Sequence, residues 1–419
     1  MGLILGIDIC DDCSQISSYN PDLGDVESIT LGGEAAADRI PTVICKKNGL
    51  DEWLIGEEAF RAALTGGGTL VDRLIKLTGK NGSATIEGTK YTAEQLIYKY
   101  IEKLIDLAAR RYGVEELDSI VFTLHDPGPR INDMLIRCAE KRGISRQLVH
   151  IYSHTETFAY YILSQSSDIW MNQVSLFDLR ENGLFYYEMR AIRGRKPIVV
   201  EARREKIPEV FALSVLDTPA GEKIADKILS SCASRVLDKK SISSVVLTGK
   251  GFIDTAWAHD FLEVICNRRR VFYAGQIFAQ GAAYAAADHI AEKSKFNYLM
   301  ICDGRLASNV SVNAIADGRK EQIMLANAGS NWYEAGSKAM FILDDIHKLD
   351  IDVYSAITDK SRKIEISLGE LPARPAKTTR IEVVLSFSSE KKMTVRVYDR
   401  GFGDLFPSSE KVIREDFTI

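Results

Sequence analysis

The sequence predicts an α/β protein in which one layered unit occurs twice and a small β domain follows. Two observations predict the repeat: residues 3–19 form an apolar run that meets polar residues and turns back, and residues 174–189 repeat that arrangement. A third observation predicts the β domain, because beyond Lys295 apolar residues alternate in period two between Gly, Pro and Asp breaks. The repeat indicates two similar lobes that face each other across a cleft.

The composition is that of a globular chain with room for two or three domains. Of its 419 residues, 46% are hydrophobic and 26% are charged. The formal charge of −5 argues against a general nucleic-acid-binding surface. The longest uncharged run, residues 271–287, is shorter than a membrane span of about 20 residues, and the start of the chain lacks the basic region of a signal peptide. The seven cysteines, an odd number, fit reduced thiols, so we expect a cytoplasmic protein. From the net charge and the short uncharged run, we expect it to bind neither nucleic acid nor membrane.

The first hairpin, residues 3–19, carries an acid where a buried strand rarely has one. A lone carboxylate at Asp8 must be paired, hydrogen-bonded or near a metal. Gly6 has no Cβ, which suits a close approach of a ligand or a neighbouring strand to the backbone. Asp178 takes the corresponding place in the second hairpin, so both acids are candidate functional residues.

Strands and helices alternate after the first hairpin, which is typical of an α/β layered domain. Thr92 and Gln95 form a capping box that begins a helix, and Gly113 ends this helix. The other elements expected in the first lobe are an edge strand over 40–45, a helix near 70–77, a strand over 119–124, a helix over 131–141, a strand over 149–152 and a helix over 155–165.

The second lobe repeats this alternation before the β domain begins. Its fully apolar strand over 244–247 leads into Thr248-Gly249-Lys250-Gly251. The helices expected around it cover 221–237, 254–266 and 276–290, with a short strand over 270–273. Strands over 363–368, 380–387 and 393–398 are expected in the β domain. We therefore place the first lobe at about 1–170, the second at about 171–295 and a β-sandwich at 296–419.

These motifs resemble those of the actin-like ATPase superfamily, and most closely those of the seventy-kilodalton heat-shock chaperones. Gly6-Ile7-Asp8 lies where that family has its first phosphate loop, and Phe177-Asp178-Leu179 lies where it has its second. Four more segments resemble family features: a connecting helix with an acid (153–161), the adenosine motif (245–251), the second connecting helix (275–286) and the end of the peptide-binding β domain (368–401). The resemblance implies a duplicated, ribonuclease H-like fold followed by a β-sandwich, over almost the whole chain.

The resemblance also implies a nucleotide site between the lobes. It implies that Asp8, Glu156 and Asp178 are the catalytic acids, which hold hydrated magnesium and the attacking water. The nucleotide-binding residues that it implies are Gly6, Asp8, Cys10, Asp11, Asp12, Asp178, Arg180, Gly183, Gly249, Lys250 and Gly251. ATP or ADP with magnesium are the cofactors implied, and a protein or an extended peptide is the partner implied.

The chain departs from this family where the phosphates would lie. Cys10-Asp11-Asp12 replaces Gly-Thr-Thr, and two carboxylates repel a triphosphate unless a metal or protonation intervenes. Arg180 and the single Gly183 stand where the family offers consecutive glycines whose N–H groups bind phosphate. Arg73 and Lys76 are both near the place of the family's catalytic lysine, without a clear match. Hydrolysis is therefore not favoured, because the phosphate cradle and the base carry most of the electrostatic catalysis.

Three functions remain open on these grounds. The first is a heat-shock-chaperone-like protein with a degenerate nucleotide site, weak or altered ATP binding, and a role in binding protein or peptide. The second is an active ATP-dependent chaperone with an atypical phosphate cradle. The third is a pseudo-ATPase scaffold that acts through protein–protein contacts.

Two weaker signals lie next to the proposed site. Cys10 and Cys13 form a C-x-x-C, but zinc needs two more ligands and the sequence has no second pair, so we expect both thiols to be structural. His154 stands two residues before Glu156, and we interpret it as a hydrogen-bonded histidine of the cleft.

Overall fold

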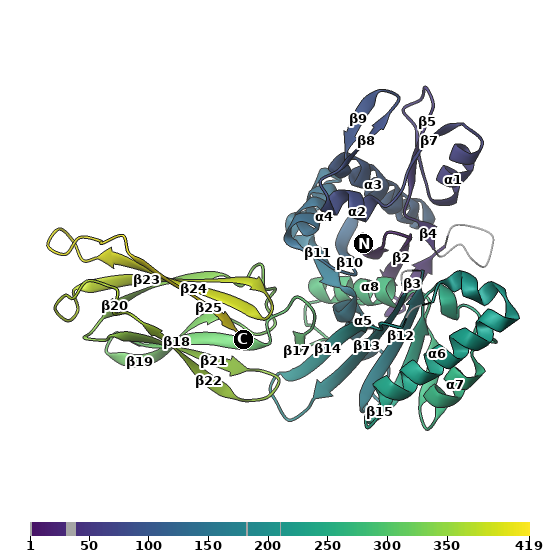
Figure 1. Ribbon diagram of the computed structural model, residues 1–419. Helices are drawn as coiled ribbons and strands as arrows, with labels where there is room; N and C mark the ends of the chain where they lie inside the picture. Colours follow the sequence, from purple (N-terminus) through teal and green to yellow (C-terminus); the bar gives the residue numbers. More distant parts are fainter. Residues whose placement is uncertain (1, 31–38, 182, 210) are drawn as a thin grey trace. The chain divides into compact units, whose positions relative to one another are not determined.

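The computed structural model describes residues 2–30, 39–181, 183–209 and 211–419 (Figure 1). It is a mixed α/β structure with several sheets, 27% helix and 40% strand. Two compact units make up the chain: unit 1 contains Met1–Arg190 and Arg203–Asn297, and unit 2 contains Ala191–Ala202 and Tyr298–Ile419. Unit 1 ends at Asn297, two residues beyond the expected boundary at residue 295. The inclusion of residues 191–202 in unit 2 was not predicted. No helix of the described residues is long and apolar enough to cross a membrane.

The first lobe of unit 1 contains a sheet of order β11-β10-β1-β2-β3, with β4 beside β2. Its strands are β1 (Leu3–Ile9), β2 (Cys13–Asn20), β3 (Asp25–Ile29), β4 (Ile40–Pro41), β10 (Leu117–Leu124) and β11 (Val149–Ser153). The central strand β1 runs parallel to β10 and antiparallel to β2. All of β1 is buried, as its continuous apolar run predicts for a strand covered on both faces.

Three long helices accompany this sheet: α3 (Ala93–Tyr112), α4 (Pro129–Lys141) and α5 (His154–Ser164), with a short 3-10 turn η1 (Arg146–Leu148) before β11. The predicted capping box at Thr92 and Gln95 is confirmed, and Gly113 ends α3 in the left-handed conformation. Buried apolar residues of α3 and α4 share one core with the sheet, including Tyr100, Leu135 and Phe122.

A smaller group of elements lies between β4 and α3. It contains β5 (Ile44–Lys47), β6 (Trp53–Ile55), α1 (Gly56–Leu64), β7 (Gly68–Val71), α2 (Leu74–Gly79), β8 (Ser83–Ile86) and β9 (Thr89–Thr92). The helix expected near 70–77 begins only at Leu74, because residues 68–71 pair with β5 as a strand. The strand expected over 40–45 is divided between β4 and β5.

The second sheet has the order β16-β15-β12-β13-β14-β17, where β17 is Tyr298–Ile301, and its first five positions correspond to those of the first sheet. The elements of the second lobe are β12 (Gln173–Arg180), β13 (Gly183–Ile192), β14 (Ile198–Lys206), η2 (Leu213–Asp217), α6 (Pro219–Leu237), β15 (Ile242–Thr248), η3 (Lys250–Phe252), α7 (His259–Cys266), β16 (Arg270–Tyr273) and α8 (Ile277–Ile290). In each lobe an acid of the central strand lies opposite a threonine of the parallel neighbour. Asp8 pairs in register with Thr123, and Asp178 with Thr248.

Helix α8 follows β16 of the second sheet in the chain but packs on the first sheet. A Cβ on Gly6 of β1 would clash with backbone atoms of Ala279 and Ala283, so a glycine is needed where this helix crosses the strand. The same helix packs on α5, where a Cβ on Gly281 would clash with the backbone of Thr157. The close approach predicted at Gly6 is therefore real, and the neighbour is a helix.

Unit 2 is a β-sandwich of two four-stranded sheets, β19-β18-β21-β22 and β20-β23-β24-β25. The strands of the sandwich are β18 (Ser308–Ala316), β19 (Arg319–Ala326), β20 (Ser337–Leu343), β21 (Lys348–Ser355), β22 (Ser361–Ser367), β23 (Thr379–Ser389), β24 (Lys392–Gly401) and β25 (Val412–Thr418). Strand β17 (Tyr298–Ile301) precedes them and pairs with residues 198–201 of β14. Alternate residues of both sheets, such as Val310, Ile351 and Val383, share one core. The strands expected over 363–368, 380–387 and 393–398 correspond to β22, β23 and β24.

Candidate functional site

The acid of the first lobe is held by a histidine from a helix. Asp8 is only 2% exposed, and its Oδ1 lies 2.7 Å from Nε2 of His154, the first residue of α5. Burial acts to raise the pKa of Asp8, but His154 and Arg180 outweigh it and lower that pKa below its ordinary value. Burial lowers the pKa of His154, so we assign a neutral ring that donates its Nε2 proton to an ionised Asp8.

The ring of His154 is fixed by its neighbours. It stacks on Phe278 of α8, with centroids 4.0 Å apart and planes 7° from parallel. The ring of His125 meets it edge-on at 5.7 Å. Nδ1 of His154 is buried and has no hydrogen-bond partner among the described residues, so the polar contact of the ring is made through Nε2.

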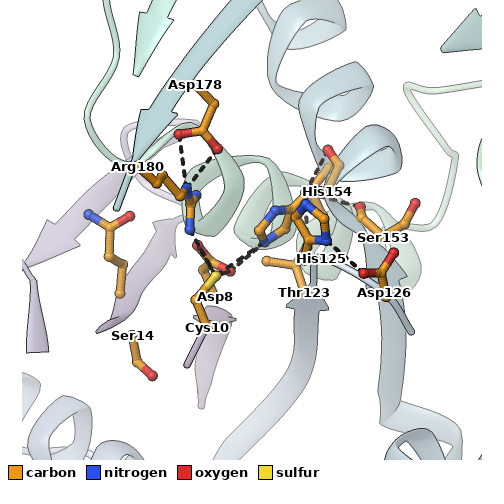
Figure 2. A network of polar contacts seen from close by, with 12 residues as sticks. Asp8, Cys10, Ser14, Thr123, His125, Asp126, Ser153, His154, Asp178 and Arg180 are labelled. Carbon is orange, nitrogen blue, oxygen red and sulfur yellow. Dashed lines mark hydrogen bonds and ion pairs between the residues drawn. The ribbon is translucent and has the colours of Figure 1, made fainter. Parts of the chain in front are cut away.

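The acid of the second lobe is held by an arginine of its own strand (Figure 2). Nε of Arg180 donates to both oxygens of the fully buried Asp178, at 2.9 Å and 2.7 Å. Burial acts to lower the pKa of Arg180, but Asp178 and the other acidic groups around it raise that pKa well above its ordinary value, so the guanidinium stays charged.

Cys10 joins the two acid–base pairs. Nη1 of Arg180 donates to Sγ of Cys10 at 2.9 Å, which brings a side chain of the second lobe to the end of β1. The same sulfur lies 3.6 Å from Oδ1 of Asp8 and 3.9 Å from Nε2 of His154. Burial and the Asp8 carboxylate raise the pKa of the Cys10 thiol well above its ordinary value. Asp8, Cys10, His154, Asp178 and Arg180 thus form one network, which we call the cleft network (Figure 2).

A cavity of about 800 Å³ opens beside the cleft network, and residues of both lobes line it, Cys10 and Arg180 among them. Asp11, Asp12 and Lys76 also line it. The backbone N–H of Lys76 donates to Oδ1 of Asp11 at 3.1 Å, and its Nζ lies 3.7 Å from Oδ2 of the same acid. The structure therefore brings Lys76, one of the two candidate basic residues, to the turn of the first hairpin.

His125 and Asp126 line the same cavity and were not identified from the sequence. Nδ1 of His125 lies 2.8 Å from Oδ2 of Asp126, and Arg204 bonds both residues, at 2.6 Å to the carbonyl of His125 and 2.7 Å to Oδ1 of Asp126. The available signal was their position directly after the apolar run 120–124, since functional side chains often follow the carboxyl ends of parallel strands.

The glycines that the resemblance assigns to nucleotide binding have neighbours within the protein. A Cβ on Gly249 would clash with the carbonyl of Leu179 and with Oδ1 of Asp178, and one on Gly251 would clash with the Leu179 side chain. Gly183 begins β13 opposite Arg180, with a φ of 128° that favours glycine. Packing within the protein therefore explains Gly249 and Gly251, as helix α8 does for Gly6, and backbone conformation explains Gly183.

Lys250, also assigned to nucleotide binding, forms an exposed ion pair with Glu181 at 2.7 Å. Glu156, the third predicted catalytic acid, is 3% exposed and lies two residues beyond His154 on α5. Residues two apart on a helix point to different sides, and the structure places His154 against Asp8.

The cleft network does not fit hydrated magnesium. Magnesium prefers an octahedral set of oxygen ligands, keeps several waters and is typically bound through one or two carboxylates. Here Oδ1 of Asp8 accepts from His154, both oxygens of Asp178 accept from Arg180, and the guanidinium already supplies a positive charge between the lobes. Magnesium therefore has no role in this network as its side chains are paired here.

Two family models match the chain. The C-terminal model of a family of unknown function, DUF5716, matches residues 25–303, and the model of a domain of unknown function, DUF8552, matches residues 305–419. Because the first match covers more than half of the sequence, the chain belongs to the DUF5716 family. No curated protein matches the chain.

Proposed function

We propose that this member of the DUF5716 family is a heat-shock-chaperone-like binding protein with a degenerate actin-like nucleotide site. In this proposal unit 1 has the duplicated, ribonuclease H-like fold of the actin-like ATPases. Unit 2 is the counterpart of the chaperones' peptide-binding domain, and its partner is a protein or an extended peptide. ATP binds weakly, and hydrolysis is not the function.

The repeated sheet supports the fold assigned here. In both lobes the central strand has two successive parallel strands on one side and its antiparallel hairpin partner on the other. Both central strands carry an acid in register with a threonine, at Asp8 with Thr123 and at Asp178 with Thr248. A β-sandwich follows in the chain, as it does in the chaperones that the sequence resembles.

The observation that carries the proposal is the cleft network. In a working member of that superfamily, acids in these places face metal-bound water and phosphate. Here His154 and Arg180 engage them instead, and burial makes each pair costly to break. Asp11 and Asp12 at the cavity add negative charge where a triphosphate would need hydrogen-bond donors.

Calorimetric titration of the purified full chain with ATP and magnesium tests the nucleotide part. We expect a dissociation constant far weaker than micromolar and no phosphate release above that of a buffer blank. A sub-micromolar dissociation constant, or hydrolysis that Asp8→Asn and Asp178→Asn both abolish, would refute a degenerate site.

One observation favours an active ATPase as the second candidate. Lys76 contacts Asp11 at the turn of the first hairpin, and Arg180, Lys206 and Arg73 line the same cavity beside its acids, so basic side chains are available to a phosphate there. If those cations bind phosphate, Lys76→Ala should reduce hydrolysis at least about tenfold, a loss of about 1.4 kcal/mol in transition-state stabilisation. Lys391→Ala, at an exposed lysine of unit 2, is the matched control.

The peptide-binding part is tested on the edge of the sandwich. Strand β20 is at the end of its sheet, and Met340 and Ile342 on it are 51% and 54% exposed. An extended peptide can extend such a sheet by main-chain hydrogen bonds. Fluorescence anisotropy of labelled apolar peptides with the full chain should show saturable binding that Met340→Lys and Ile342→Lys weaken. The same substitution at the exposed Ile224 of α6 should have no effect. If no peptide binds, the pseudo-ATPase scaffold becomes the preferred function.

A further inference from the structure

Three side chains with different donor atoms converge at the end of β1. The ligand atoms of Asp8, Cys10 and His154 all lie within 4.8 Å of one another. They offer an oxygen, a sulfur and a nitrogen, and all three residues are buried, at 2%, 8% and 0% exposed. From this geometry we propose that Asp8, Cys10 and His154 bind a zinc-class transition-metal ion. The inference does not depend on the nucleotide proposal.

The spacing of the three atoms suits a tetrahedral ion. Zinc bonds of about 2.0–2.3 Å at a tetrahedral angle place nitrogen and oxygen ligands about 3.4 Å apart, and each of them about 3.6 Å from sulfur. The observed separations are 2.7 Å from Asp8 Oδ1 to His154 Nε2, 3.6 Å from that oxygen to Cys10 Sγ, and 3.9 Å from the sulfur to the same nitrogen. The ion would open the carboxylate–imidazole pair by several tenths of an ångström and leave the sulfur nearly in place.

The backbone explains why the ligands meet. Asp8 and Cys10 are two residues apart at the end of an extended strand, so their side chains leave it on the same side. His154 begins α5 directly after β11, which is the second neighbour of β1 in the sheet. The ring of His154 is held by stacking on Phe278. Its Nε2 points toward Asp8 (Figure 2).

Charge and hydrogen bonding around the sulfur also favour a bound cation. Arg180 donates to Sγ of Cys10, which suits a thiolate, and outer hydrogen bonds to a ligand commonly tune metal sites. The charge of Arg180 is already balanced by Asp178. A divalent ion with the Asp8 carboxylate and the Cys10 thiolate is then neutral overall. Its binding releases the thiol proton to solvent, and the proton of the neutral His154 ring passes from Nε2 to Nδ1 by exchange with solvent, so one proton is lost in total.

The mixed donor set selects the class of metal. Imidazole and thiolate ligands suit zinc and its neighbours among the transition metals, whereas magnesium and calcium prefer oxygen alone. Three protein ligands leave a fourth position for water or an exogenous ligand. Cys10 lines the cavity of about 800 Å³, which gives the ion a path of entry.

Metal binding by the untagged full chain tests the site. Protein treated with a chelator and a phosphine reductant is equilibrated with zinc, passed through a desalting column and analysed for metal. We expect one zinc per chain, a rise in melting temperature with zinc and none with magnesium. Cobalt in place of zinc should give the near-ultraviolet absorption of a cobalt–thiolate bond. No retained zinc in the wild-type chain, or a cobalt complex without that band, overturns the proposal.

Variants assign the ligands. Cys10→Ser and His154→Gln should each weaken zinc binding at least about 100-fold, more than the loss of an outer hydrogen bond costs. Cys13→Ser, at the other cysteine of the C-x-x-C, and Cys266→Ser, at an exposed cysteine, should keep the wild-type stoichiometry. Loss of zinc in Cys13→Ser, or its retention in Cys10→Ser, overturns the assignment. If Cys10→Ser fails to fold, the cobalt–thiolate band of Cys13→Ser and Cys266→Ser identifies the cysteine ligand instead: its survival in both supports Cys10, and its loss in either contradicts it.

Discussion

The two central hairpins of unit 1 each bury an aspartate, and each aspartate has a different kind of partner. Asp8 and Asp178 occupy matching places, each opposite a threonine of the parallel neighbour. Asp178 takes its partner, Arg180, from two residues further along its own strand, whereas Asp8 takes His154 from a helix more than a hundred residues away. A buried carboxylate can thus be balanced locally by a full charge, or at a distance by a neutral hydrogen-bond donor. Only the pair of Asp8 and His154 consists of side chains that can both bind a zinc-class ion, as proposed above.

Loss of Arg180 should have the largest effect on stability. Arg180→Met leaves the fully buried Asp178 carboxylate without its counter-charge, so we expect the free energy of unfolding to fall by about 3–5 kcal/mol. Urea denaturation followed by circular dichroism measures it. Lys250→Met breaks an exposed ion pair and should cost less than about 1 kcal/mol. Equal losses for the two variants would show that the buried ion pair contributes no more to the free energy of unfolding than the exposed one.

Unit 2 also balances a buried aspartate with an arginine, in the pair of Asp399 and Arg374, and this pair tests whether such ion pairs matter equally there. Asp399 is 1% exposed; both its oxygens accept from Arg374, and the N–H groups of Gly401 and Ser409 donate to it. Asp399→Asn should destabilise the protein by about 3 kcal/mol at neutral pH, because it leaves Arg374 without its buried partner.

The pH dependence of that loss has a definite sign. Burial acts to raise the pKa of Asp399, but Arg374 and the hydrogen bonds lower it well below its ordinary value. Stability from this group is therefore fully present above the unfolded pKa of about 3.9 and is lost as pH falls through the lower folded pKa. The difference between wild type and Asp399→Asn in urea should shrink below about pH 4. A difference that grows on acidification would reverse the assigned shift.

Loss of the histidine should cost less than loss of the arginine. His154→Phe keeps the stacking on Phe278 but removes the donor to Asp8, so we expect a loss of about 1.5–3 kcal/mol in metal-free protein. His154→Gln, which can still donate, is the matched control and should recover part of it. A His154→Phe variant as unstable as Arg180→Met would show that both acids depend equally on a positive charge.

The two threonines should give the smallest effects, and unequal ones. Thr248→Val leaves the carbonyl of Ala274 without its donor and should cost about 1–2 kcal/mol. Thr123→Val should cost about 0.5–1 kcal/mol, because Thr157, its partner, keeps a hydrogen bond to the carbonyl of Ser153. The reverse order in urea denaturation would show that the threonine of the first lobe is the more important.

Local patterns predicted the elements whose information lies close together in the sequence. The capping box at Thr92, the buried run of β1 and the alternation of β23 each depend on a few neighbouring residues. The helix near 70–77 was wrong at its start, because pairing with β5, more than twenty residues earlier, makes residues 68–71 a strand. Tertiary pairing there outweighs local preference.

The cleft network was predictable only in part. The requirement that Asp8 have a partner follows from burial, and it is confirmed by His154. Which partner it has depends on how β1, β11 and α5 are arranged, and no spacing in the sequence reports that. The resemblance assigned Arg180 to nucleotide binding, and the structure pairs it with Asp178 and Cys10. The sequence identified charged residues but not which of them meet.

The chain enters unit 2 twice, at Ala191 and at Tyr298, and this has a practical consequence. Residues 198–201 pair with β17, and Arg195 bonds carbonyl groups of Ala356 and Ile357, so unit 2 needs a piece that lies more than ninety residues before its main part. A fragment begun at residue 296 would lack that piece. The chain crosses between the units at three places: 190–191, 202–203 and 297–298. A protease that cuts once near residue 297 leaves residues 191–202 of unit 2 covalently joined to unit 1 at the other two places.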